Sequence, residues 1–218
     1  MRARPRSVEP AVATLVLLES AVFALEVGRG DSRSIDAFAL IPYDVTHGIV
    51  LAQPGAPLPV LTLVTAQFVH ASWPHLAGNL IVLGLAGPPI ERALGAVRFV
   101  AFYLTCGTFG SLAVIGAAPS SHVPVVGASG AIAGLLGAYL IVHPLARFGP
   151  YGLFVPALFI GAWALLQFEH GFGTVDGGDA LTSGVAYFAH IGGFLAGIIT
   201  IGLFASTRSA WPGGGGRR

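Results

Sequence analysis

Long apolar runs, separated by short polar stretches, dominate this chain of 218 residues. A helix of about 20 apolar residues crosses the roughly 30 Å hydrocarbon core of a bilayer. The pattern therefore predicts an all-α, polytopic membrane protein with six transmembrane helices in one bundle over residues 11–205. The predicted spans lie near Ala11–Val27, His75–Ile90, Phe99–Ala118, Gly127–Val142, Tyr151–Phe168 and Val185–Phe204.

The remaining residues form two tails and one long connection. Residues 1–10 are expected to be a cytoplasmic N-terminal tail, and residues 206–218, with the stretch WPGGGGRR, a disordered cytoplasmic tail. The first span carries Glu19 and Glu26, which argues against a cleaved signal peptide. A connection from Gly28 to about Ser72 precedes the second span.

Arginine residues gather at one end of the predicted spans. With the N-terminus inside, only Arg29 and Arg33 fall outside, which agrees with the positive-inside rule and places both termini in the cytoplasm. Every basic residue is arginine, which fits a GC-rich genome, and we expect a prokaryotic plasma (inner) membrane. The arginines on the cytoplasmic side are Arg2, Arg4, Arg6, Arg92, Arg98, Arg147, Arg208, Arg217 and Arg218.

Composition supports the membrane assignment and excludes several functions. The chain is 54% hydrophobic and 10% charged, with a mean hydropathy of +0.78, whereas soluble domains are about a quarter charged. The net charge of +1 and the lack of a basic stripe argue against a nucleic-acid partner. One cysteine, Cys106, excludes an intrachain disulfide and a cysteine-based metal site. No cofactor is expected.

Polar residues inside the predicted spans mark a candidate site, because they are costly in a membrane. Ser129 is near the start of the fourth span, His190 near the start of the sixth, and His75 and Asn79 lie in the second. In the predicted topology these starts all face the exterior. His75 and His190 as metal ligands are a weaker alternative, since no carboxylate or third ligand is suitably placed.

These residue types suit hydrolysis by a nucleophile. A serine hydroxyl needs a base such as neutral imidazole to take its proton. The free N–H groups at a helix start can stabilise an oxyanion, and His75 and Asn79, one turn apart, can donate to the same point. Because no acidic residue within a span completes a triad, we expect a Ser129–His190 dyad. Gly193 and Gly197, with the glycines of the fourth span, predict close packing of these two helices.

Three motifs, HASWPHLAGN, GASG and AHIGGFLAG, occur in this order on successive even-numbered spans. Together they resemble the rhomboid family of intramembrane serine proteases over roughly residues 38–204. The resemblance implies that Ser129 is the nucleophile and His190 the general base. It also implies that His75, Asn79 and the backbone N–H of Ser129 form the oxyanion site. His70 matches a further family histidine with a structural role.

The chain departs from the family pattern at two places. An aromatic residue often follows the nucleophile by four positions, where this chain has Ala133. His190 is then held more loosely, or by Tyr187 or Phe188 instead. The tryptophan–arginine pair common in the first external connection is also absent, since the corresponding stretch reads LTLVTAQF.

The sequence thus favours an intramembrane serine endopeptidase. Its expected substrates are single-span or other membrane proteins with helix-weakening segments near the external face, and its other partner is the lipid bilayer. The stretch 170–184 is the expected mobile cap. One alternative is an inert rhomboid-like protein that binds membrane proteins. Another is a small transporter, which would call for repeat symmetry that the chain does not show.

Overall fold

A computed structural model describes residues 9–29, 37–49, 56–142 and 180–205. Within these ranges the secondary structure is helical, apart from one isolated antiparallel bridge between Leu40 and Val125. The predicted all-α class is therefore confirmed for the described residues. The predicted fifth span, 151–168, lies outside them.

Five long helices coincide with five of the predicted spans. Three of them, at Pro10–Arg29, Ala96–Ala117 and Tyr187–Phe204, are long and apolar enough to cross a membrane, while the total of six spans stays a prediction. The long helices are α1 (Pro10–Arg29), α5 (Trp73–Leu94), α6 (Ala96–Ala117), α7 (Ser129–Val142) and α10 (Ala180–Phe204).

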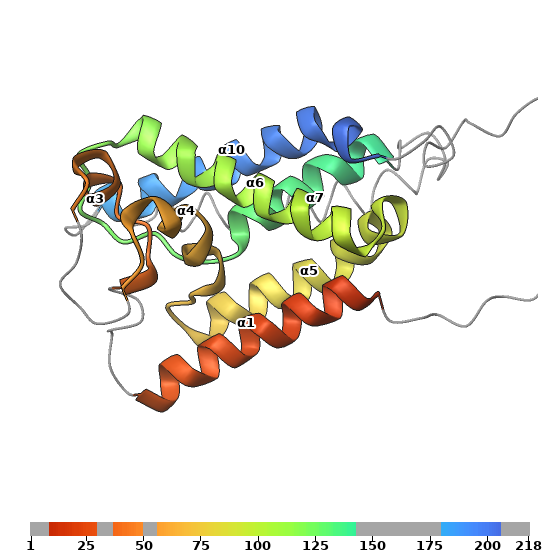
Figure 1. Cartoon of the computed structure of the whole chain (residues 1–218), viewed down its shortest axis with the longest axis horizontal. Helices are drawn as coiled ribbons and strands as arrows, with labels where there is room; N and C mark the ends of the chain where they lie inside the picture. The colour runs from red at the N-terminus through yellow and green to blue at the C-terminus, as the bar shows by residue number, and fades with distance from the viewer. Residues whose placement is uncertain (1–8, 30–36, 50–55, 143–179, 206–218) are drawn as a thin grey trace, which may run out of the picture.

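The long first connection contains short helices. These are α3 (Pro42–His47), a 3-10 turn (Pro59–Leu61), α4 (Thr62–Thr65) and a second 3-10 turn (Ala66–Phe68). Figure 1 shows α3 and α4 at one end of the bundle, where α1 and α6 end and where α5, α7 and α10 begin. Helices α5, α7 and α10 thus run in one direction, and α1 and α6 run in the opposite one. His75 and Asn79 on α5 and Ser129 on α7, three of the predicted site residues, lie in the part of their helices nearest this end.

The opposite end of the bundle is held by charged groups. The backbone N–H groups of Ala11 and Val12, in the first turn of α1, donate to the two carboxylate oxygens of Glu91 on α5 at 2.9 and 2.8 Å. A carboxylate suits this position because the start of a helix has free N–H groups and a positive dipole end. Arg92 pairs with Glu9 at 2.9 Å beside it. These contacts join the start of α1 to the end of α5.

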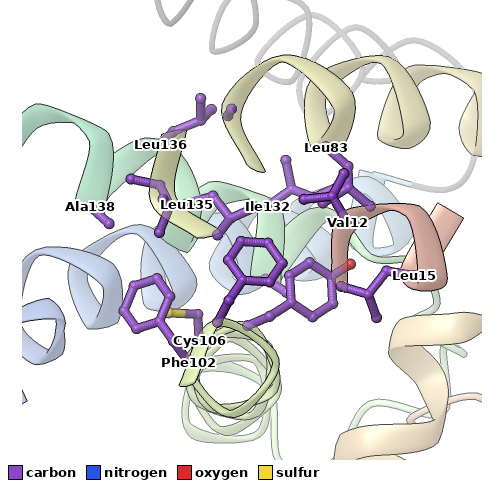
Figure 2. Packing of buried hydrophobic residues seen from close by; sticks show 14 of the residues in the cluster. Val12, Leu15, Leu83, Phe102, Cys106, Ile132, Leu135, Leu136 and Ala138 are labelled. Atoms are coloured by element: carbon purple, nitrogen blue, oxygen red, sulfur yellow. The ribbon is translucent and has the colours of Figure 1, made fainter. Parts of the chain in front are cut away.

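The apolar core lies between α1, α5, α6, α7 and α10. Figure 2 shows Phe102 and Cys106 of α6 near Leu135 of α7, with Leu83 of α5 and Leu15 of α1 towards the other side. One polar pair is buried among them, since the Tyr103 hydroxyl donates to Glu19 Oε1 at 2.9 Å. Pairing offsets part of the cost of removing both groups from water.

Helices α7 and α10 touch backbone to backbone. A Cβ atom added at Gly193 would collide with the carbonyl oxygen of Gly130, and one added at Gly197 would collide with the carbonyl oxygen of Gly134. A Cβ atom added at Gly137 would also collide with the carbonyl oxygen of Phe194. The predicted close packing of these two helices is therefore confirmed, and it depends on the lack of side chains at the contact.

Replacement of Gly197 by alanine tests this contact. The added methyl meets the backbone of α7, which cannot rotate away, so Gly197→Ala should lower the free energy of unfolding by about 1–3 kcal/mol or more. Gly202→Ala on the same helix is the matched control, because its added methyl meets nothing within 4 Å. Thermal unfolding in detergent would measure both. Equal stability of the two variants would contradict the packing described.

Candidate active site

Ser129 is the first residue of α7 and is buried. The turn before it depends on Gly127, whose φ of +112° lies in a region that favours glycine. The Gly127 N–H donates to the carbonyl of Ala66 at 2.8 Å, which ties this turn to the first connection. Because α7 begins here, the N–H groups of its first turn have no acceptors within the helix. They can therefore bind an anion.

His190 lies directly opposite Ser129. Its Nε2 is 2.7 Å from Ser129 Oγ, which is hydrogen-bond distance between two buried side chains. In its neutral form with the proton on Nδ1, the ring accepts the hydrogen bond of the serine hydroxyl. His190 lies near the start of the apolar span Tyr187–Phe204, as the sequence predicted. Helix α10 itself begins earlier and already includes Ala180, about 15 Å before His190.

His75 and Asn79 lie one turn apart on α5 and reach towards the same turn. A Cβ atom added at Gly127 would be 2.6 Å from His75 Nε2 and 3.5 Å from Asn79 Nδ2. Both side chains therefore approach the backbone two residues before Ser129. The four predicted site residues come from three helices that begin at one end of the bundle (Figure 1).

His70 supports Asn79, which gives its expected structural role a partner that the sequence did not predict. Asn79 Nδ2 is 3.0 Å from His70 Nε2, and both groups are buried. The His70 ring also meets the His75 ring edge to face, at 5.2 Å between centroids. The backbone N–H of His70 donates to Glu26 Oε2 at 3.4 Å, which links α1 to this loop. The signal in the sequence was the match of His70 to a further family histidine with a structural role, which did not identify Asn79 as its partner.

Burial keeps His70 neutral. Loss of solvent and, to a smaller extent, the neighbouring His75 lower its pKa, and a hydrogen bond with the Phe68 backbone opposes them; together they bring the pKa to about 4. A neutral ring can accept the Asn79 amide hydrogen at Nε2, whereas a protonated ring cannot. The hydrogen bond between Asn79 and His70 therefore depends on this low pKa.

A small cavity of about 30 Å³ adjoins Ser129. Polar lining comes from Gln67 and Ser111, and Gly127 and Gly130 contribute backbone. The volume is enough for a water molecule, which needs about 10–15 Å³ by the same kind of measure, together with polar partners. Water can thus be held next to the serine inside an otherwise apolar bundle.

The structure gives the burial of Ala133, where the family often has an aromatic residue, and of Tyr187 and Phe188, which were expected to hold His190 instead. Ala133 is fully buried within the packed bundle, while Phe188 is 41% exposed and Tyr187 is half-buried.

Of the expected cap at 170–184, residues 180–184 belong to α10, and the rest lies outside the described ranges. Among the described residues, no three metal-ligating side chains gather closely enough to hold a metal ion.

Comparison with known proteins gives a consistent match. The model of the Rhomboid domain matches residues 58–207. Rhomboid protease GluP of Bacillus subtilis is 31% identical over 175 residues, which are 80% of this chain and 31% of the relative. Rhomboid-like protein 11, chloroplastic, of Arabidopsis thaliana is 31% identical over 154 residues, 67% of this chain and 53% of the relative.

A shorter match is to the putative rhomboid protease YdcA of Bacillus subtilis, 40% identical over 80 residues, 37% of this chain and 40% of the relative. The chain thus spans between about a third and a half of the length of these relatives.

The pKa of His70 predicts a pH dependence of stability. In the unfolded chain His70 has its ordinary pKa of about 6.5, so it is protonated below that pH, whereas in the folded protein it is protonated only below about pH 4. The free energy of unfolding should therefore fall across this window as pH is lowered, by at most about 3 kcal/mol from this residue. His70→Gln keeps an acceptor for Asn79 but does not titrate. Unfolding of both proteins between pH 7 and 4.5 should show their difference narrowing towards acid, and a constant difference would contradict a neutral buried His70.

Proposed function

The chain belongs to the rhomboid family, and from this premise we propose that it is an intramembrane serine endopeptidase with a Ser129–His190 dyad. The observation that carries the proposal is the 2.7 Å distance between Ser129 Oγ and His190 Nε2 at the start of a helix. Serine and imidazole at this distance are the minimum for nucleophilic attack on a peptide carbonyl.

In the first step His190 Nε2 takes the hydroxyl proton while Ser129 Oγ bonds to the substrate's carbonyl carbon. The carbonyl oxygen then becomes an oxyanion. His190 next gives the proton to the amide nitrogen, the C–N bond breaks, and the amine leaves. Water held in the cavity beside Ser129 attacks the acyl ester, with His190 again as base. The acid product leaves and the serine hydroxyl is restored.

The oxyanion is received by the Ser129 N–H and by the side chains of His75 and Asn79. An amide NH₂ group has two hydrogens, so Asn79 can give one to His70 and keep the other for the oxyanion. His70 is a positioning residue in this mechanism. As an acceptor it holds the amide with NH₂, rather than C=O, towards it, and the orientation exists before substrate binds.

The buried position of Ser129 within the bundle indicates the kind of substrate. A transmembrane helix hides its carbonyl groups in its own hydrogen bonds, so an attacked segment must first unwind. We therefore propose membrane-protein substrates with glycine, proline or other helix-weakening residues near the external end of a span. We also propose six spans in a prokaryotic plasma membrane, with both termini in the cytoplasm, as the arginine distribution indicates.

The dyad is tested by loss of either partner. Ser129→Ala and His190→Ala should each abolish cleavage of a membrane-embedded substrate, and the double variant should be no worse, because residues that act as one unit are not additive. Labelling by a fluorophosphonate should be lost in Ser129→Ala. Ser121→Ala, in the loop that precedes α7, is the matched serine control and should label normally. Clear turnover by folded Ser129→Ala would overturn the dyad, and no labelling of the unchanged chain would favour an inert binding protein.

The oxyanion assignment predicts the effects of two further variants. Asn79→Ala should lower kcat by about 10²-fold, the scale for one such donor, with much less change in KM. His70→Ala should give part of this loss, and in the presence of Asn79→Ala it should add little, because it acts through that amide. His70→Gln, which keeps an acceptor, should restore part of the rate. Additive losses for His70 and Asn79 would contradict the coupling, and unchanged rates in Asn79→Ala and in the double His75/Asn79 variant would contradict the oxyanion site.

A further inference from the structure

A second set of contacts lies outside the dyad, between α3 and the loop 118–128 that joins α6 to α7. Figure 1 shows α3 beside this loop at the site end of the bundle. Apart from one bridge residue, the loop is neither helix nor strand, and its prolines Pro119 and Pro124 have no N–H to donate. The loop leads directly into Ser129, the first residue of α7. Its path is therefore fixed by neighbouring segments, and that path sets where α7 begins.

Backbone hydrogen bonds attach this loop to the segment that includes α3. The N–H of Tyr43, in the first turn of α3, donates to the carbonyl of Ser121 at 3.0 Å. Leu40, just before α3, exchanges two hydrogen bonds with Val125, at 2.9 and 2.8 Å. This one segment thus fixes the loop backbone before and after its midpoint.

The side chain of Tyr43 adds a contact at the midpoint itself. Its ring centroid is 4.0 Å from that of His47, with the planes 18° apart, and 4.1 Å from that of His122, with the planes 32° apart. Two rings this close and this nearly parallel to a third must lie on its opposite faces, because they would overlap on the same one. His47 Nδ1 is 3.0 Å from the carbonyl oxygen of Tyr43, which fixes the first of them. Stacked rings attract one another, so the exposed His122 ring of the loop is held against α3.

The candidate site is close to this stack along the chain. Leu40 and Val125, the bridged pair, both line the cavity beside Ser129. Soon after Val125 the loop makes the turn at Gly127, and the free N–H groups of α7 follow at once. A shift of the loop would therefore move both the cavity wall and the N–H of Ser129.

We propose that Tyr43 is a positioning residue for the oxyanion site. Its ring, held between His47 and His122, fixes the loop so that the N–H of Ser129 is directed to the place where the oxyanion forms. Tyr43 acts through the loop and touches no reacting atom. Because this N–H stabilises charge that develops only in the transition state, loss of the ring lowers kcat and leaves KM almost unchanged. This role rests on the proposed function.

The test measures how a water-soluble fluorophosphonate labels the full-length chain in lipid nanodiscs, as a rate constant and as the fraction of protein labelled. Tyr43→Leu should lower the rate constant about five- to tenfold, a part of the roughly 10²-fold scale for outright loss of one donor, with the labelled fraction unchanged. Tyr43→Phe keeps the ring and should stay within about twofold of the unchanged chain. Phe109→Leu, at an exposed aromatic residue of α6, is the matched control and should label normally. With a membrane-embedded substrate, kcat should follow the same order.

A second variant removes the same contact from the other side. His122 is exposed, so His122→Ala serves where Tyr43→Leu does not unfold cooperatively. The double variant should be no slower than the slower single one, because both remove one stack. A smaller labelled fraction at an unchanged rate constant would show that the stack only stabilises the fold, and would overturn the positioning role. Equal rate constants for Tyr43→Leu and the unchanged chain would also overturn it, whereas no labelling of the unchanged chain would overturn the proposed function and this role with it.

Discussion

The candidate site depends on one contact, the backbone approach of α7 to α10. Gly193 lies three residues after His190 and meets the carbonyl of Gly130, which directly follows Ser129. Because the helices touch at this point, a short serine side chain can reach His190 Nε2 at 2.7 Å. Any side chain at the contact would separate the helix axes, and Ser129 Oγ and His190 Nε2 would separate with them. The glycines thus set the geometry of the candidate site.

The first connection supplies hydrogen-bond partners for the turn before α7 and for Asn79. A turn at membrane depth leaves backbone polar groups that must be satisfied by protein or by water in a cavity. The Gly127 N–H finds the carbonyl of Ala66, and the backbone of Val125 pairs with that of Leu40. The same connection carries His70, which orients Asn79. One segment therefore satisfies the irregular backbone before Ser129 and prepares the side chain that faces it.

Apolar runs and glycine spacing predicted most of this arrangement, since both reflect constraints local to each helix. The bounds of α1, α5 and α6 were close to those observed, and the close packing of α7 on α10, which brings Ser129 to His190, followed from the glycines. The start of α10 was missed because ALTSG is less apolar than the span and looks like a loop. The hydrogen bond of His70 to Asn79 could not be foreseen, because it joins a loop to a helix and no periodicity records such a contact.

The two ends of the bundle are built for different tasks. At the end opposite the site, Glu91 accepts two N–H groups of α1 and Arg92 pairs with Glu9, so charge fixes helix to helix. At the other end, buried polar side chains gather at the candidate site, and the connection packs on α1 partly across an apolar groove. Stiffness at the first end lets the second carry irregular backbone and a cavity.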